Sequence, residues 1–165
     1  MSLFNIIVSV LTLQFLSLSV FAVSGDSMVP TLHDGDIFVI ETDLENAELN
    51  RDSIVVFSLE DQEDFFYVKR IIGLPGEKII LRNGEIFIDV KGNELKLEED
   101  FLEENVRTFL KSSSYKDDYE QAFSVPEESY FVLGDNRVDS EDSRYFSDPF
   151  VRKEQIKGIY LNKLL

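Results

Sequence analysis

The chain contains no cysteine and only one histidine, His33. Without cysteine it forms neither a disulfide scaffold nor a thiolate metal site. The single histidine also limits serine chemistry, because most serine hydrolases use an imidazole as the base that activates the hydroxyl. We therefore expect no bound metal and no cofactor, and any reactive serine must use a base other than the usual one.

Basic residues are also scarce, with 16 Lys and Arg against 32 Asp and Glu, for a formal net charge of −16. Nucleic-acid binding requires clustered basic side chains that contact phosphates, so no nucleic-acid partner is expected. Such acidity is typical of a well-solvated surface. A length of 165 residues fits one ordinary domain, with room for an anchor and an insertion.

Charged residues are absent from residues 3–23, where Leu, Ile, Val and Phe dominate. A run of this length can cross a bilayer. It fits a cleaved signal peptide, a membrane anchor, or a shorter anchor that leads into a buried strand. A signal peptide needs a basic start, but no Lys or Arg precedes Ser24. We therefore predict that residues 1–19 anchor the chain in a cell membrane, although the missing basic flank leaves the orientation unset.

Most of the remaining sequence has the pattern of short strands. Runs of β-branched and aromatic residues bounded by Asp, Asn and Gly are typical of strands, and they occur at residues 37–41, 54–59, 65–72, 78–82, 85–90, 129–133 and 156–161. Asn83-Gly84 is a strong hairpin signal, since both residue types tolerate positive φ. The sequence predicts a mostly β, barrel-like domain over residues 20–165.

Residues 92–126 differ in composition from the rest of this domain. They are rich in Glu and Asp but retain Phe, Leu and Tyr. That apolar content is too high for full disorder. We expect an acidic surface insertion that contains one short helix at residues 101–110.

The turn SGDSMVPTL (residues 24–32) directly follows the apolar run. Gly25 permits unusual backbone dihedrals, and Pro30 fixes its own φ and restricts Val29. This bent, exposed backbone suits a serine whose hydroxyl projects toward a substrate. Ser27 is therefore a candidate nucleophile. His33 lies six residues later, and we interpret it as a loop or surface histidine rather than as the base.

Lys69 lies within an otherwise apolar strand pattern. Alternation places Tyr67, Lys69 and Ile71 on one face and Val68, Arg70 and Ile72 on the other. If the Lys69 face is buried, desolvation lowers the pKa of the amine, which can then accept the proton of a serine. The alternative is a surface lysine that protects a sheet edge. The presence of the Ser27 motif in the same chain favours the role of base.

A third group of polar residues lies in GDNRVDSEDSR (residues 134–144). Its acids, hydroxyls and arginines can build a hydrogen-bonded corner, in which an Asp–Arg pair fixes the loop and a serine hydroxyl orients a nearby amine. An exposed acidic loop is the alternative. A calcium loop would carry fewer arginines and end in a bidentate Glu.

Three blocks therefore stand in order: GDSMVPTL (25–32), YVKRIIGLPGE (67–77) and GDNRVDSEDSR (134–144). Together they closely resemble the type I signal peptidase family, membrane-anchored Ser–Lys endoproteases that release signal peptides from exported proteins. The resemblance covers residues 20–159. It implies an all-β catalytic core with a smaller inserted region, and a location at the cell membrane with the catalytic domain on the extracytoplasmic side. The implied partners are preprotein signal peptides and membrane lipid.

The resemblance also implies roles for individual residues. Ser27 matches the nucleophile and Lys69 the general base, while Ser140 matches the serine that orients the lysine amine. The family's structural polar residues near the site are matched by Arg70, Asp135, Asp142 and Arg144. In this family, two pockets accept small substrate residues at the first and third positions before the cleaved bond. The positions that line these pockets are matched by Val23, Met28, Leu32 and Val68. Shallow apolar pockets of this kind select Ala-like side chains by excluding larger ones.

The backbone N–H of Ser27 would serve in the oxyanion hole. Some members contribute a second hydroxyl from a serine two positions before the nucleophile, where this chain has Gly25.

Two rival functions are open at the level of sequence. A repressor-type self-cleaving peptidase also uses a Gly-Asp-Ser-Met turn, but it carries an Ala-Gly or Cys-Gly cleavage site, and neither dipeptide occurs in this chain. A non-catalytic membrane-anchored binding protein on the same scaffold would be indicated by loss of Ser27, Lys69 or Ser140, and all three are present.

Overall fold

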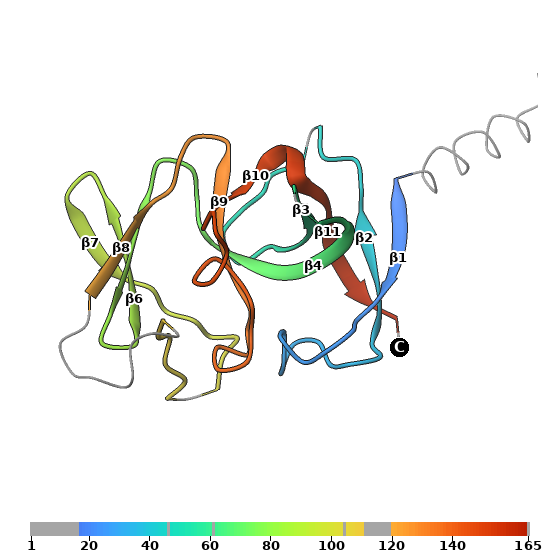
Figure 1. The fold of residues 1–165 in the computed structure, drawn as a ribbon, viewed down its shortest axis with the longest axis horizontal. Coiled ribbons are helices and arrows are strands. Elements are labelled where there is room, and N and C mark those ends of the chain that lie inside the picture. The colour runs from blue at the N-terminus through green and yellow to red at the C-terminus, as the bar shows by residue number, and fades with distance from the viewer. Residues whose placement is uncertain (1–16, 46, 61, 104, 111–119, 165) are drawn as a thin grey trace, which may run out of the picture.

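The computed structural model describes residues 17–45, 47–60, 62–103, 105–110 and 120–164. The predicted anchor at residues 1–19 falls almost wholly outside them. Among the described residues, no helix is long and apolar enough to cross a membrane. The chain is mostly β, as predicted, and forms two sheets (Figure 1).

The larger sheet has seven strands in the order β1-β2-β11-β3-β4-β9-β10. Its strands are β1 Leu18–Ala22, β2 Ile37–Glu41, β3 Ile54–Leu59, β4 Gln62–Gly73, β9 Ser129–Leu133, β10 Val151–Arg152 and β11 Ile156–Lys163, with the short 3₁₀ helix η1 at Lys153–Gln155. The smaller sheet has the order β7-β6-β5-β8. Its strands are β5 Lys78–Arg82, β6 Glu85–Val90, β7 Asn93–Lys96 and β8 Glu120–Ser124.

The first five strands of the larger sheet, from β1 to β4, curl into an incomplete barrel. The rings of Phe21 on β1 and Phe66 on β4 lie 5.4 Å apart, although three strands separate β1 from β4 in the sheet. Phe21 and Val68 pack against a buried cluster inside this barrel: Val23, Met28, Leu32, Phe38, Ile40, Ile54 and Val56. The predicted barrel-like core is therefore confirmed.

Strand β3 is buried on both faces, which explains its continuous apolar sequence. Ile54 and Val56 belong to the barrel interior, whereas Val55 and Phe57 belong to a second cluster with Tyr67 and Ile71. A strand covered on both sides reads as an unbroken hydrophobic run rather than as an alternating one. Its neighbour β4 is thereby held at the centre of the fold.

The smaller sheet packs at the far end of β4. A third buried cluster joins Ile72, at the end of β4, to residues of β5, β6 and β9. In the hairpin between β5 and β6, Asn83 and Gly84 have φ of 53° and 79°, as their sequence predicts. Strands β7 and β8 also belong to this sheet, so residues at both ends of the 92–126 segment extend the hairpin.

The helix predicted at residues 101–110 is wrong. The described residues of this stretch form turns and irregular backbone. Two backbone bonds tie the region to the hairpin instead: Leu97 N–H donates to the carbonyl of Ile86 (2.9 Å), and Thr108 N–H donates to that of Gly84 (2.9 Å). These tertiary bonds override a local helical preference.

Candidate active site

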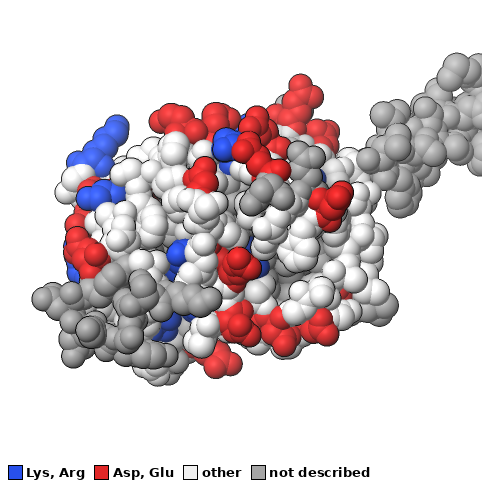
Figure 2. Space-filling model, viewed as in Figure 1, with Lys and Arg blue, Asp and Glu red and all other residues white. Residues whose placement is uncertain are grey.

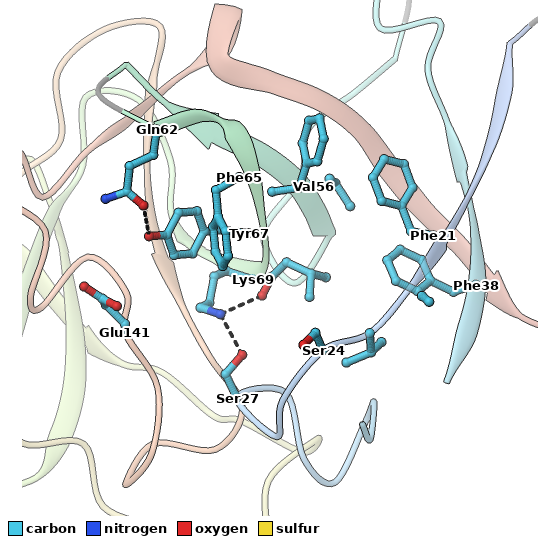
Figure 3. Close-up of a pocket in the computed structure, with 14 residues that line it drawn as sticks. Phe21, Ser24, Ser27, Phe38, Val56, Gln62, Phe65, Tyr67, Lys69 and Glu141 are labelled. Carbon is cyan, nitrogen blue, oxygen red and sulfur yellow. Dashed lines mark hydrogen bonds between the residues drawn. The ribbon is translucent and has the colours of Figure 1, made fainter. Parts of the chain in front are cut away.

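Ser27 and Lys69 meet between β1 and β4. Nζ of Lys69 lies 2.7 Å from Oγ of Ser27 and 2.9 Å from the carbonyl oxygen of Val68 (Figure 3). Ser27 stands on the turn between β1 and β2, in which Gly25 has φ of 91°. Lys69 lies on β4, and its side chain points toward Ser27. The structure thus brings together two side chains that the sequence separates by 42 residues.

Lys69 is buried, with 3% of its surface exposed. Burial lowers the pKa of the amine from 10.5 to about 8, although the negative charges of Asp142, Glu141 and Asp135 oppose this shift. A charged amine donates the bond to Ser27, whereas a neutral amine accepts the hydroxyl hydrogen. At mildly alkaline pH the pair therefore has the chemistry of a nucleophile and its general base.

A cavity of about 520 Å³ opens beside this pair. Its apolar lining includes Phe21, Phe38 and Val56, together with Val23 and Val68 from the predicted pocket set, and its polar lining includes Ser24, Gln62 and Glu141 (Figure 3). Met28 and Leu32, the other two predicted pocket residues, are fully buried in the barrel interior beside Val23.

Two strand edges border this cavity. Strand β1 pairs with β2, and residues 62–69 of β4 pair with β3 along one edge. Pairing of β4 with β9 begins only at Arg70. Within the described chain, no strand covers the outer edge of β1 or the second edge of residues 62–69. These two edges lie on opposite sides of the cavity, and no other strand of the described chain pairs with them.

The 134–144 loop lies beside Lys69 because Arg70 pairs with Leu133 in the β4–β9 register. Asp135 accepts two bonds from the guanidinium of Arg70, at 2.9 Å from Nε and 2.6 Å from Nη2. Asp142 accepts two from Arg144, both at 2.8 Å. All four side chains are buried, and bidentate pairs of this kind fix orientation as well as position. They are the four residues that the sequence predicted as structural polar groups.

Ser140 lies in the same loop, buried, and its Oγ has no hydrogen-bond partner among the described residues. The structure therefore does not contain a bond between Ser140 and Lys69. Gly134 packs directly against it: a Cβ at position 134 would lie 2.1 Å from Oγ of Ser140 and 2.4 Å from the carbonyl oxygen of Ser27. Only glycine allows the loop and the serine turn to approach this closely.

Comparison with known proteins shows the family. The family model described as signal peptidase, peptidase S26 matches residues 1–162. The chain belongs to this family.

Individual signal peptidases are similar over most of their length. The chain is 38% identical to a signal peptidase I of Bacillus amyloliquefaciens over 154 residues, covering 93% of this chain and 78% of the relative. It is 39% identical to signal peptidase I S of Bacillus subtilis strain 168, covering 84% and 72%. The crystal structure of a signal peptidase I from Enterococcus faecalis V583 superimposes with a TM-score of 0.52 at 36% identity, covering 68% of this chain and 97% of that one.

Membership of the signal peptidase family makes the chain a hydrolase, a serine endopeptidase. The only histidine of the chain does not contact Ser27. The side chain of His33 is 57% exposed and lies 3.9 Å from Asp36, while the Ser27 hydroxyl bonds to Lys69.

Three further residues hold this signal peptidase site together, and none of them was predicted as a site residue. Asn136 donates its backbone N–H to the carbonyl of Ser27 (3.0 Å) and its side-chain amide to that of Asp26 (3.1 Å). Thr31 donates its hydroxyl to Asp135. Arg137 donates from Nε to the carbonyl of Gly134 (3.0 Å). All three lie within the quoted blocks, so their motif positions were the available signal.

Proposed function

We propose that the chain is a membrane-anchored Ser–Lys peptidase that removes signal peptides from exported preproteins. The observation that carries this proposal is the 2.7 Å contact between Ser27 Oγ and the amine of Lys69, with that amine buried and its pKa lowered to about 8. The names of the relatives supply the substrate class.

The reaction has two steps. Neutral Lys69 takes the proton of the Ser27 hydroxyl, and Oγ attacks the scissile carbonyl to form an acyl-enzyme. The proton then passes from Lys69 to the departing amine, which leaves as the new N-terminus of the mature protein. The same amine, neutral again, activates a water molecule that hydrolyses the ester and regenerates Ser27.

The hydrogen-bonding capacity of a neutral lysine amine explains the role we assign to Ser140. Such an amine has one lone pair and two N–H groups; the lone pair faces Ser27 and one N–H reaches the carbonyl of Val68 at 2.9 Å. The second N–H is available for Ser140, whose buried Oγ lacks a partner among the described residues. The backbone N–H of Ser27 stabilises the oxyanion, because Gly25 offers no side chain.

The signal peptide binds as an added strand between β1 and β4, whose uncovered edges border the cavity. Alternate side chains of an extended peptide point to the same face. The first and third residues before the cleaved bond then enter the apolar cavity beside Val23 and Val68, which suits small side chains.

Exposed apolar side chains support a membrane surface beside this groove. Val20 is 62% exposed and Phe65 57%, on the two strands that border the cavity. Large exposed apolar groups that gather in this way indicate a binding surface. They lie where the apolar N-terminal run enters the fold, which supports a catalytic domain that rests on a membrane surface. The extracytoplasmic side follows from the proposed substrates, because signal peptides are removed from exported proteins there.

Cleavage of a purified preprotein in detergent tests the proposal. Ser27→Ala and Lys69→Ala should each lose activity, with a loss of about 10²- to 10⁴-fold for the missing base. His33→Ala is the matched control and should cleave at the wild-type rate. Normal cleavage by Ser27→Ala or Lys69→Ala would contradict the proposal. A wild-type protein that binds the preprotein without cutting it would indicate a binding protein on the same scaffold.

A further inference from the structure

Three buried arginines, Arg70 beside the 134–144 loop and Arg137 and Arg144 within it, contact one segment of the acidic insertion. This segment, the described residues 97–103 and 105–110, adjoins the small sheet, to which Leu97 and Thr108 bond through their backbones. The ring of Phe101 lies 3.9 Å from the guanidinium carbon of Arg70. The carbonyl of Phe109 accepts a bond from Nη1 of Arg144 at 3.0 Å. Arg137 is bound by the side chains of Glu99 and Thr108.

Arg137 is bound by two side chains of this segment, those of Glu99 and Thr108. Its side chain is fully buried, and that of Glu99 is 14% exposed. Nη1 and Nη2 of Arg137 bind the two carboxylate oxygens of Glu99, and Nη1 also donates to Oγ1 of Thr108 at 2.6 Å. The fork-shaped guanidinium is therefore fixed on its outer side by the insertion.

On its inner side, Arg137 reaches the residue that contacts both serines of the site. Its Nε donates to the carbonyl of Gly134 at 3.0 Å. Gly134 packs against Oγ of Ser140 and the carbonyl oxygen of Ser27 so closely that no Cβ fits. A shift of Arg137 moves the Gly134 peptide, and through it the spacing between the serine turn and the loop.

We propose that Glu99 is a positioning residue of the protease: through Arg137 and Gly134 it sets the placement of Ser140 and Ser27. This inference rests on the proposed function. It gives the acidic insertion a part in the reaction, although Glu99 does not line the cavity beside Ser27. Misplacement of about 1 Å at a reacting group can cost about 10²-fold in rate, so loss of Glu99 should lower kcat and leave KM unchanged.

Glu99→Gln, Glu99→Asp and Glu77→Gln, compared on a preprotein substrate, test this inference. Glu77 is the matched control, because it also binds an arginine through two oxygens (Arg51, at 2.6 and 3.0 Å) and its side chain is 13% exposed. We expect Glu99→Gln to lose about 10- to 100-fold in kcat at constant KM. Glu77→Gln should lower the melting temperature by about as much as Glu99→Gln does, but it should keep the wild-type kcat.

Glu99→Asp separates geometry from charge. It keeps the carboxylate but shortens the side chain by one methylene, so Arg137 must move outward to stay paired. A positioning role predicts a lower kcat for Glu99→Asp with a melting temperature close to that of the wild type. The inference is overturned if Glu99→Asp keeps the wild-type kcat, or if Glu99→Gln and Glu77→Gln lose kcat equally. An inactive wild type would instead refute the proposed function, whatever the variants do.

Discussion

Lys69 is a residue on which function and stability make opposite demands. Its 3% exposure disfavours the ammonium form, and the carboxylates of Asp142, Glu141 and Asp135 only partly restore that form. The result is an amine with a pKa of about 8, which suits a general base. The same burial makes the charged lysine a cost to folding at neutral pH.

Replacement of this lysine by Lys69→Met should therefore stabilise the fold at neutral pH. A shift from 10.5 to about 8 corresponds to a difference on the order of 3 kcal/mol in the free energy of unfolding. Below pH 8 both folded and unfolded wild type carry the proton, and the folded state bears the full penalty. Between pH 8 and 10.5 the folded state loses its proton first, so wild-type stability rises with pH and the difference shrinks.

Denaturant unfolding at several pH values measures this effect. The advantage of Lys69→Met should be largest below pH 8 and vanish above 10.5, the ordinary pKa of lysine. Lys157→Met, at an exposed position of β11, controls for the loss of a surface amine. Equal stability of wild type and Lys69→Met at neutral pH would show that the lysine carries no burial penalty.

The site residues could be predicted from the sequence where a motif spans them. Ser27 lies in contact with Lys69, and the four predicted polar residues form two ion pairs, Arg70 with Asp135 and Arg144 with Asp142. Motif position does not reveal burial, however. Met28 and Leu32 were expected to line the substrate pocket but lie in the barrel interior, because the turn that exposes Ser27 points its apolar side chains inward. Glu99 has no motif, and only the tertiary fold brings it to Arg137.

At the scale of the elements, the proposed substrate position is the gap between the uncovered edges of β1 and β4. If a peptide bonds to both edges, successive residues bond to alternate edges, because the N–H and C=O of one residue point to one side of the strand and those of the next residue point to the other. N-methylation of any single amide over the few residues before the cleaved bond should then weaken binding. The expected cost is about 2- to 10-fold in KM per amide, the net value of one hydrogen bond.

A series of singly N-methylated peptides, each assayed for KM, checks this prediction. The unmethylated peptide and one methylated far outside the groove serve as controls. Sensitivity at every second amide only would mean that the peptide uses one edge, and no sensitivity at all would rule out strand addition.

Strand pattern predicted the strands outside the insertion better than those within it. The runs at 37–41, 54–59, 78–82, 85–90 and 129–133 match β2, β3, β5, β6 and β9 residue for residue. Strand β7 is exposed along its whole length, so its sequence carries no apolar alternation to detect. Residues 101–110 have the composition of a helix, but their backbone and side-chain groups bond to the hairpin and to the arginines of the site.

At the scale of the whole molecule, the exposed apolar residues Val20 and Phe65 beside the cavity lie apart from the acidic surface. Asp and Glu gather along the upper and lower borders of the face in Figure 2, while Lys and Arg are sparse there. Strand β1, with the exposed Val20, lies at the opposite end of the molecule from β7, with the exposed Leu95 (Figure 1). A membrane should therefore contact the β1 end and leave the β7 end in water.

The absence of tryptophan makes this orientation measurable by fluorescence. Val20→Trp and Leu95→Trp each introduce the only tryptophan of the chain at an exposed position. After reconstitution of the full chain in lipid vesicles, Val20→Trp should emit at shorter wavelength and be quenched by brominated lipid. Leu95→Trp should emit as in water. Equal quenching of the two variants would contradict the proposed orientation.

The pH dependence of preprotein cleavage tests the Ser–Lys mechanism most directly. Because only neutral Lys69 accepts the Ser27 proton, kcat/KM should rise with pH through an apparent pKa of about 8, and His33→Ala should give the same profile. A profile that instead rises near the ordinary histidine pKa of about 6.5, and that collapses in His33→Ala, would contradict the account.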